Sequence, residues 1–564
     1  MIANSTSLRY NLALSEHGMC DGLSNPLSKA EKLELLIAHA AAWRSLDSAR
    51  PETADLVVGW SAPMAVSGNV LVFAKEVSGP AQDHRRERER GDEAEQVGLR
   101  PPTERHMALL VLRVPSALRR VEAAHWVLSL PAVASEMCID ASQDLLIYVL
   151  YVMPHCSLEE VNHGTHAFPL LGVFIRDGAF HVRTLSTGAV YPLVEHRGFF
   201  GVWNGSRRFE VFNVCVCGDF VAAGTGVSFI SVWNWKTGQH VRDQVRLLAI
   251  YTLIGSQNNS FTIAKITEVR FSSFDFLDEH HILYSMSNDD RIYVYDLRRP
   301  SAEQQQPQQK EQEREADTKP VGFQLALPPI HRMTTSRYIQ VRRNALPSGT
   351  APPYDTEGGN ACGSSSPPPF HADPRERLIV LRIATSPVER GEEQFELHAP
   401  ARALIDRYAS AIAAQRRRHE GRVDGDVNGD SDADVEANAE ALLPWSAWRD
   451  AVRTTPPQKV PYVIPARMIN YGMRVVSHPP NWEEGVLHID SYRPRSRTRE
   501  AGESANAEVV GARAGGGGMC GTRQAIGLPG DAEAKAGLLS VLCEDGLLCY
   551  KVRTGWGRFL RYSI

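Results

Sequence analysis

The sequence predicts an all-β fold, organised as a β-propeller with a short helical extension at its N-terminus. From about Ala54 onward the chain consists of short runs rich in Val, Ile, Phe and Tyr, each bounded by Gly, Asp, Asn or Ser. Runs of this length and composition are typical of β-strands. Several of them also repeat one order of strands and turns, which indicates an architecture built from similar blades.

The repeated order is clearest where a strand ends in a turn. An apolar strand is followed by a polar or glycine turn, then by a strand with aromatic or aliphatic residues and a second turn. We place four segments at the same position in this order: FHVRTLSTG (180–188), ISVWNWKTG (230–238), RIYVYDLR (291–298) and LLCYKVRTG (547–555). The first two lie about 50 residues apart, within the ~40–50-residue period of propeller blades.

The tryptophan-rich segment predicts how one blade packs. We expect VWNWKTG to be the third strand and exit turn of its blade, with Val232 and Asn234 on one face and Trp233 and Trp235 on the other. Its VWNW run, and Tyr295-Asp296 still more closely, resemble the Trp-Asp signature of WD repeats. The sequence predicts six or seven WD-like blades, some of them degenerate.

A helical extension precedes the strands and occupies residues 1–50. Ser28 and Glu31 have the spacing of a capping box, so a helix is expected to begin there. Its apolar residues recur at intervals of three and four and form one stripe, which must dock on the following domain. These residues are Leu33, Leu36, Ala40 and Trp43.

The propeller is expected to span residues 54–564, with polar or glycine-rich insertions between strands. These segments contain too little apolar surface to offset the entropy of ordering them, so we interpret them as disordered. They lie near residues 83–104, 301–320, 345–370, 416–440 and 495–535.

Composition excludes several classes of protein. The net charge of −5 gives no general attraction to nucleic acid or to anionic membranes, and no apolar run approaches the ~20 residues of a membrane-spanning helix. The N-terminus lacks the pattern of a secretory signal. The nine cysteines are scattered, and Cys215 and Cys217 are expected to be small buried residues on one face of a strand. We expect a cytoplasmic or nuclear protein.

Two N-terminal motifs suggest a family. The first is SLRYNLALSEHGMCDG (7–22), in which the motif residues are Leu8, Tyr10, Leu12, Gly18, Met19, Asp21 and Gly22. The second is the helix that follows, in which they are Glu31, Leu33, Leu35, Leu36, Trp43, Arg44 and Leu46. Together they resemble the region directly after the F-box in F-box proteins of mushroom-forming fungi, where a propeller-like β region follows.

The resemblance implies a role in ubiquitin transfer. It identifies the chain as the substrate-receptor portion of an F-box protein in a cullin-type (SCF) ubiquitin ligase. An F-box should precede Leu8, but only seven residues do, so either the F-box is lost or the start codon is misplaced. A Skp-type adaptor is therefore expected as a partner only if an F-box is present upstream.

No catalytic, cofactor or metal site is predicted. Phosphate-loop and nucleophile-elbow motifs do not occur, and acids at strand ends such as Asp144 fit ordinary β-turns. We therefore expect a non-enzymatic protein that recognises other proteins. The alternative is a WD-type scaffold unconnected to ubiquitin. A propeller enzyme would need acids or histidines gathered around the central channel.

One segment stands out as a candidate for binding the protein substrate, whose identity the sequence does not give. Residues 195–212 combine aromatic and arginine side chains, the types that most often anchor protein interfaces. The candidate residues are Phe199, Phe200, Trp203, Arg207 and Arg208. The competing interpretation is that the aromatic residues pack inside an inter-blade loop or begin an outer strand.

Overall fold

The structure is a computed structural model of the 564-residue chain. It describes residues 5–22, 25–45, 52–54, 60, 63–78, 105–116, 118–119, 121–152, 175–192, 199–201, 211–225, 229–243, 271–286, 291–297, 322–328, 334–342, 344–345, 368–387, 393–420, 441–455, 458–459, 470–471, 474–477, 486–493, 520–527, 538–543, 546–551 and 559–563.

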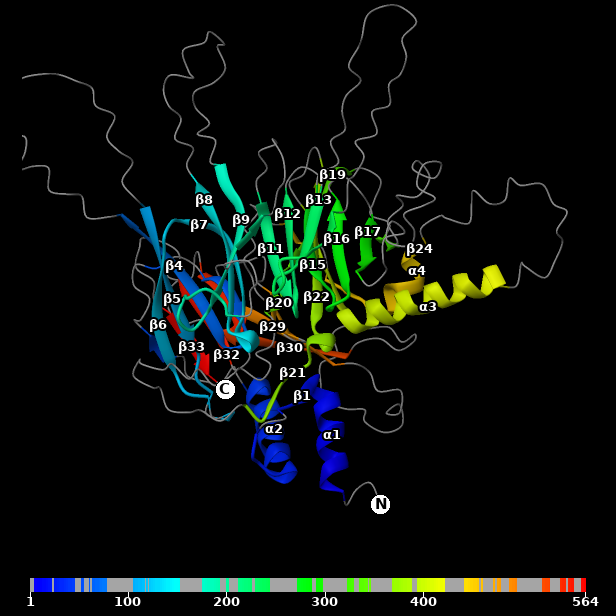
Figure 1. Ribbon diagram of the computed structural model, residues 1–564. Helices are drawn as coiled ribbons and strands as arrows, with labels where there is room; N and C mark the ends of the chain where they lie inside the picture. The colour runs from blue at the N-terminus through cyan, green and yellow to red at the C-terminus, as the bar shows by residue number, and fades with distance from the viewer. Residues whose placement is uncertain are drawn as a thin grey trace, which may run out of the picture.

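Within these ranges, seven antiparallel sheets follow one another along the chain as the blades of a β-propeller (Figure 1). Blade 1 comprises β3 (Pro63–Ser67), β4 (Val70–Ser78), β5 (Arg105–Arg113) and β6 (Ala124–Leu130). Blade 2 comprises β7 (Ala134–Asp140), β8 (Leu145–Val152), β9 (Ile175–Thr184) and β10 (Phe199–Gly201). Blade 3 comprises β11 (Val211–Cys217), β12 (Phe220–Thr225), β13 (Phe229–Asn234) and β14 (His240–Asp243).

The remaining blades contain the irregular strands. Blade 4 comprises β15 (Phe271–Phe276), β16 (His281–Met286), β17 (Arg291–Asp296) and β18 (Gly322–Ala326), and blade 5 comprises β19 (Thr334–Arg342), β22 (Leu378–Pro387), β23 (Glu393–Pro400), β25 (Arg453–Thr454) and β26 (Gln458–Lys459). Blade 6 comprises β27 (Asn470–Tyr471), β28 (Arg474–Ser477), β29 (Val486–Arg493) and β30 (Cys520–Gly527), with β20 (Asn344–Ala345) beside β27. Blade 7 comprises β31 (Leu538–Cys543), β32 (Gly546–Lys551), β33 (Phe559–Ser563) and β2 (Glu52–Ala54).

The first strands of successive blades lie side by side, as expected for a ring. Strand β3 contacts β7, β7 contacts β11, β11 contacts β15, and β15 contacts β19, while β28 of blade 6 contacts β31 of blade 7. The ring is closed by the two ends of the chain, because β2 pairs antiparallel with β33 and becomes the outer strand of blade 7. Among the described residues, β2 is therefore the first strand along the chain that belongs to the propeller.

Blades 2 to 5 each contribute to two separate hydrophobic cores, as the alternation of side chains along a strand requires. In blade 3, Trp233 and Trp235 pack against blade 2, where the rings of Trp233 and Phe180 lie edge to face at 5.4 Å. The opposite face presents Val232, Cys215 and Cys217 to Phe274 of blade 4. This confirms the predicted facing of the tryptophans and the burial of both thiols.

Strands β9, β13 and β17 are the third strands of their blades, as the repeated segments predict. The turn after each is tied to the first hairpin of the same blade: Leu185 N donates to Asp144 O at 2.8 Å, and Trp235 N to Asp219 O at 3.0 Å. The fourth segment differs, because β32 is the second strand of blade 7. Its local pattern is the same, but the outer strand of that blade comes from the other end of the chain.

An accessory unit follows β23 and covers the outer side of blades 4 and 5. Helix α3 (Ala401–Glu420) packs Leu404 and Tyr408 on the core between these blades, and its far end projects away from the sheet (Figure 1). Strand β24 (Ala441–Leu443) then adds to β18 in parallel, before the short helix α4 (Trp445–Trp448) and the 3₁₀ turn Arg449–Ala451.

The structure thus places regular elements inside or at the edges of three ranges expected to be insertions. Helix α3 continues to Glu420, β30 occupies Cys520–Gly527, and β20 and β21 (Phe370–Ala372) lie at the two ends of the range 345–370. Strand β30 pairs with the outer edge of β29 and satisfies backbone N–H and C=O groups that would otherwise be unpaired there. The rest of the five ranges lies outside the described residues. Among the helices of the described ranges, none is both long and apolar enough to cross a membrane.

Candidate functional site: the N-terminal hairpin and its dock

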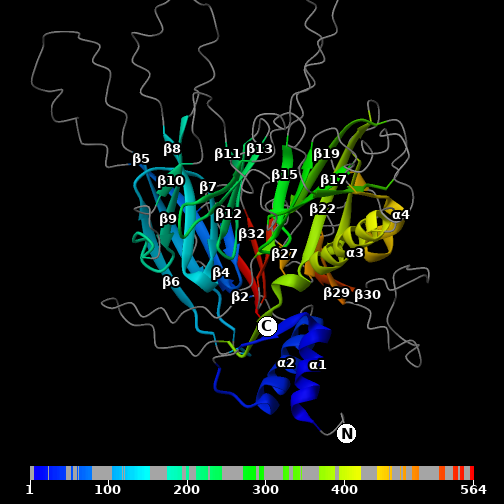
Figure 2. The same cartoon turned by 45° about the vertical axis from the view of Figure 1, so that its right-hand side comes forward.

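Two helices form a hairpin beneath the propeller, and local capping signals define their ends (Figures 1 and 2). Helix α1 (Thr6–His17) begins at Ser5, whose side chain accepts from Leu8 N, and ends at Gly18 in the left-handed conformation, with φ of 63°. Helix α2 (Lys29–Arg44) begins with a complete capping box between Ser28 and Glu31, as predicted. The four residues of its predicted apolar stripe are all buried.

The chain between the helices is held by a short sheet. Strand β1 (Met19–Asp21) pairs antiparallel with β21, which belongs to the long connection between the first two strands of blade 5. The pairing is extended at both ends, because Asp373 N donates to Gly18 O and Gly22 N donates to Pro369 O, each at 2.9 Å. A Cβ atom at Gly22 would lie 2.0 Å from Pro368 O, so this close approach requires glycine.

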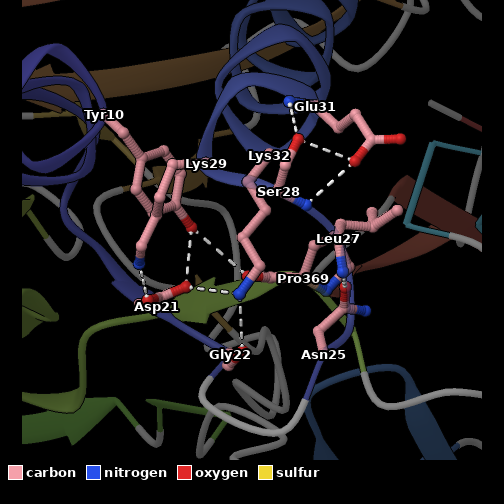
Figure 3. A network of polar contacts seen from close by, with 10 residues as sticks. All are labelled: Tyr10, Asp21, Gly22, Asn25, Leu27, Ser28, Lys29, Glu31, Lys32 and Pro369. Carbon is pink, nitrogen blue, oxygen red and sulfur yellow. Dashed lines mark hydrogen bonds and ion pairs between the residues drawn. The ribbon is translucent and has the colours of Figure 1, made fainter. Parts of the chain in front are cut away.

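A polar network centred on Asp21 ties both helices to this sheet (Figure 3). Tyr10 of α1 is fully buried, and its hydroxyl donates to Asp21 Oδ1 at 3.0 Å and lies 3.3 Å from Pro369 O. Lys32 of α2, only 4% exposed, donates to Asp21 Oδ1 and to Gly22 O, each at 2.9 Å. Lys29 pairs with the other carboxylate oxygen of Asp21.

The electrostatics favour the charged form of this carboxylate. Burial alone would raise the pKa of Asp21, but hydrogen bonds from Lys29, Lys32 and Tyr10 outweigh it and lower the pKa. Burial and the hydrogen bond to Asp21 raise the pKa of Tyr10, so its hydroxyl remains a donor. Lys32 is therefore a buried lysine that is paired with a carboxylate and also donates to a carbonyl oxygen. The stability of such a buried pair depends on its exact geometry, and losing either partner is far more costly than in a solvent-exposed ion pair. We call this network the lock.

The dock extends to three blades. Phe370 of β21 lies with its ring 5.5 Å from that of His39 of α2, and its carbonyl accepts from Arg119 Nη1 of blade 1 at 3.2 Å. At the end of α2, the guanidinium of Arg474 in blade 6 lies 4.2 Å from the ring centroid of Trp43. Since β21 continues into blade 5, the hairpin is joined to blades 1, 5 and 6.

The face of α1 opposite this dock carries apolar side chains. Leu8 and Leu12 are one helical turn apart and are 49% and 57% exposed. Both belong to the motif on which the family resemblance rests, whereas Tyr10, Gly18, Met19, Asp21 and Gly22 of the same motif are explained by the dock. The two leucines form an apolar ridge on the free side of the hairpin.

The predicted partner-binding residues are only partly described. Phe199 and Phe200 lie in β10, the outer strand of blade 2, opposite His181 and Phe180 of β9. This position matches the competing interpretation, in which the aromatic residues begin an outer strand. Trp203, Arg207 and Arg208 lie outside the described residues, so the site stays a prediction.

In the described part of the chain, no group of three or more His, Cys, Asp or Glu side chains could hold a metal ion. Among the described residues, a buried polar cluster lies between blades 5 and 6. It contains Arg382, Glu396, His398 and Tyr492, with Glu396 Oε2 at 3.1 Å from His398 Nε2 and His398 Nδ1 against the Tyr492 hydroxyl. All four are buried, so this cluster joins two blades.

Comparison with known proteins gives the following. No family model and no curated protein matches the chain. Similar solved structures include the WD40 domain of Toxoplasma gondii coronin, with 8% identity, a TM-score of 0.34 and coverage of 91% of this chain and 85% of that one. The β-propeller domain of Cps50 (Swd1) from Myceliophteria thermophila has 8% identity, a TM-score of 0.36 and coverage of 91% and 99%. With scores this low, the propeller fold rests on the sheet order, the ring of first strands and the closure by β2.

Sequence reasoning identified part of the dock. Tyr10 and Asp21 stand out only through the family motif, and the stripe of α2 stands out through its period. Lys32 and Phe370 carry no such signal, because lysine is usually exposed and a three-residue strand after a proline run has no recognisable pattern. Their roles depend on pairing between segments about 350 residues apart.

Proposed function

We propose that this chain is a non-enzymatic protein-recognition module, the substrate-receptor portion of an F-box protein in a cullin-type ubiquitin ligase. The observation that carries the proposal is the lock between the N-terminal hairpin and the propeller. A receptor of this kind must hold its substrate at a fixed position relative to the ligase. A buried lysine–carboxylate pair, a shared sheet and contacts with three blades supply such a rigid joint.

Two surfaces support the same proposal. The apolar ridge of Leu8 and Leu12 is exposed on α1 and is available to a helical module on the N-terminal side. In propellers, the loops that connect strands form the two rims of the ring, and such loops often bind partners. One end of the molecule would then serve the ligase and the other the substrate.

Affinity purification of the endogenous protein from its own cells, with mass spectrometry of bait and partners, tests the proposal. We expect bait peptides upstream of Met1 together with a Skp-type adaptor. Leu12→Glu should weaken recovery of the adaptor, because it places a charge on the ridge. Val127→Glu on β6 is the matched control, since Val127 is also 57% exposed but lies on the outer strand of blade 1.

The outcomes of this experiment distinguish the ubiquitin-ligase role from the scaffold role. If the wild-type protein recovers no adaptor, the ubiquitin-ligase role is wrong, and a WD-type scaffold unconnected to ubiquitin takes its place. If both variants retain the adaptor equally, the ridge takes no part in the attachment.

A further inference from the structure

The closure of the propeller depends on a very short strand. Blade 7 draws three strands from the C-terminal end and only the three-residue β2 from the N-terminal end, with Glu52 opposite Arg561, Thr53 opposite Leu560 and Ala54 opposite Phe559. Strand β2 is the edge strand of the four-stranded sheet of blade 7, and it holds its place there with only three paired residues. Further contacts near this edge would strengthen the closure.

The hairpin is attached directly to this strand. Helix α2 ends at Arg44 and β2 begins at Glu52, so seven residues, 45–51, join them. Seven extended residues reach at most about 25 Å. The end of α2 therefore cannot lie farther than about this distance from the start of β2 while β2 stays paired with β33.

The anchors of the hairpin lie on both sides of the closure. Arg474 of blade 6 contacts Trp43 of α2, and Arg119 of blade 1 donates to Phe370 O, on the β21 strand to which β1 is paired. Blade 7 follows blade 6 along the ring and passes through β2 into blade 1. Figures 1 and 2 both show the hairpin below the propeller.

We propose that the hairpin, together with the β1–β21 sheet, is a second clasp over the closure of the propeller, and that its release loosens blade 7. The lock is the network of Tyr10, Asp21 and Lys32. A partner that displaces the hairpin would open the ring at blade 7, whereas a partner that binds the docked hairpin would hold the ring shut. This device is independent of any role in a ubiquitin ligase.

Amide hydrogen exchange of the purified full chain tests the clasp. Lys32→Met keeps the length of the side chain and removes the ammonium group from Asp21 and Gly22. We expect exchange to rise roughly tenfold or more in α2 and β21, and also in β2 and β33, because a charged hydrogen bond stabilises enough to shift an opening equilibrium by that factor. Strands β12 and β13 of blade 3 should be unchanged.

Lys236→Met is the matched control, since Lys236 pairs with Asp219 at the surface of blade 3. It should leave the exchange of β33 as it is. A rise in Lys32→Met that is confined to the hairpin and β21 overturns the proposal. Should that variant fail to fold, the wild-type protein in low urea gives the answer: α2 and β33 must open with the same free energy, and separate values overturn the clasp.

Discussion

Single side chains in this propeller are fixed by the alternation of each strand between two cores. Trp233 and Val232 are neighbours in sequence, yet they belong to the cores on opposite sides of blade 3. Trp233 is 5% exposed and lies against Phe180 of blade 2. A residue in such a position contributes to the contact between blades as well as to its own sheet.

Trp233→Ala should therefore lower the free energy of unfolding by about 3–5 kcal/mol, because it leaves a cavity between two blades. Urea denaturation followed by circular dichroism measures the change. Val127→Ala, at an exposed position on β6, should stay within about 0.5 kcal/mol of the wild type. A similarly small effect for Trp233→Ala would contradict the packing.

Among the elements, the hairpin shows how charge holds a helix to a sheet. Asp21 accepts hydrogen bonds from both helices, and its pKa is lowered in the folded protein. A carboxylate with a lowered pKa contributes stability that is fully present above its unfolded pKa, near 3.9. That contribution is lost as the pH falls through the lower pKa of the folded state.

Asp21→Asn should consequently destabilise the dock at neutral pH, by about 1.5–3 kcal/mol for the loss of charged hydrogen bonds. The difference between variant and wild type should begin to shrink as the pH falls below about 4, where the carboxyl group of the unfolded chain becomes neutral, and should be lost below the lowered pKa of the folded state, where the folded wild-type carboxylate is neutral as well. Native-state hydrogen exchange of α2 at pH 7 and at low pH measures both values. A difference that does not depend on pH would show that the charge of Asp21 is not what holds the hairpin.

The seam between blades 5 and 6 depends on buried charge as well. Glu396 lies between Arg382 and His398, and His398 reaches Tyr492 across the seam. Glu396→Gln should cost about 3–5 kcal/mol, because it removes the carboxylate that a buried guanidinium faces. Arg402→Gln is the comparison, since Arg402 and Glu376 form a pair in which Arg402 is mostly exposed, and it should cost at most about 1 kcal/mol. Thermal unfolding of both variants decides whether the buried cluster matters more.

Elements differ in how well the sequence predicts them. The capping box at Ser28 and the strand that ends in WNWKTG are local patterns, and the structure confirms both. The segment LLCYKVRTG has the same local pattern but is the second strand of blade 7. The sequence does not predict this position, because no local signal shows that β2 supplies the outer strand of that blade. The dock of β1 on β21 was missed for the same reason: it joins segments that are distant in sequence. Long-range pairing, rather than propensity, sets these positions.

At the scale of the whole molecule, the ring is closed by the pairing of β2 with β33 in blade 7, so the arrangement of all the blades depends on this one pairing. Ending the chain after Lys551 removes β33 and leaves β2 with no strand to pair with. The shortened protein should lose its cooperative unfolding transition and aggregate, because exposed strand edges associate. Calorimetry and size-exclusion chromatography measure both effects.

A deletion of similar length inside the chain provides the control. Residues 83–96 lie in the connection between β4 and β5, whose ends are already joined by pairing of Ser78 with Arg105. Their removal should leave the unfolding transition in place, since such connections tolerate shortening. If both deletions behave alike, closure at blade 7 is not what holds the ring.

The pairing of β2 with β33 also determines when the propeller can close during synthesis of the chain. The two strands are about 500 residues apart in the chain, so the first strand of the propeller to leave the ribosome waits for the last. At roughly 5–20 residues per second, that wait is on the order of 25–100 s. During this time the unfinished sheets expose unpaired edges in the crowded cell. The ring can therefore close only after β33 has been synthesised, and a nascent chain of this protein is a natural client for chaperones that shield open sheet edges.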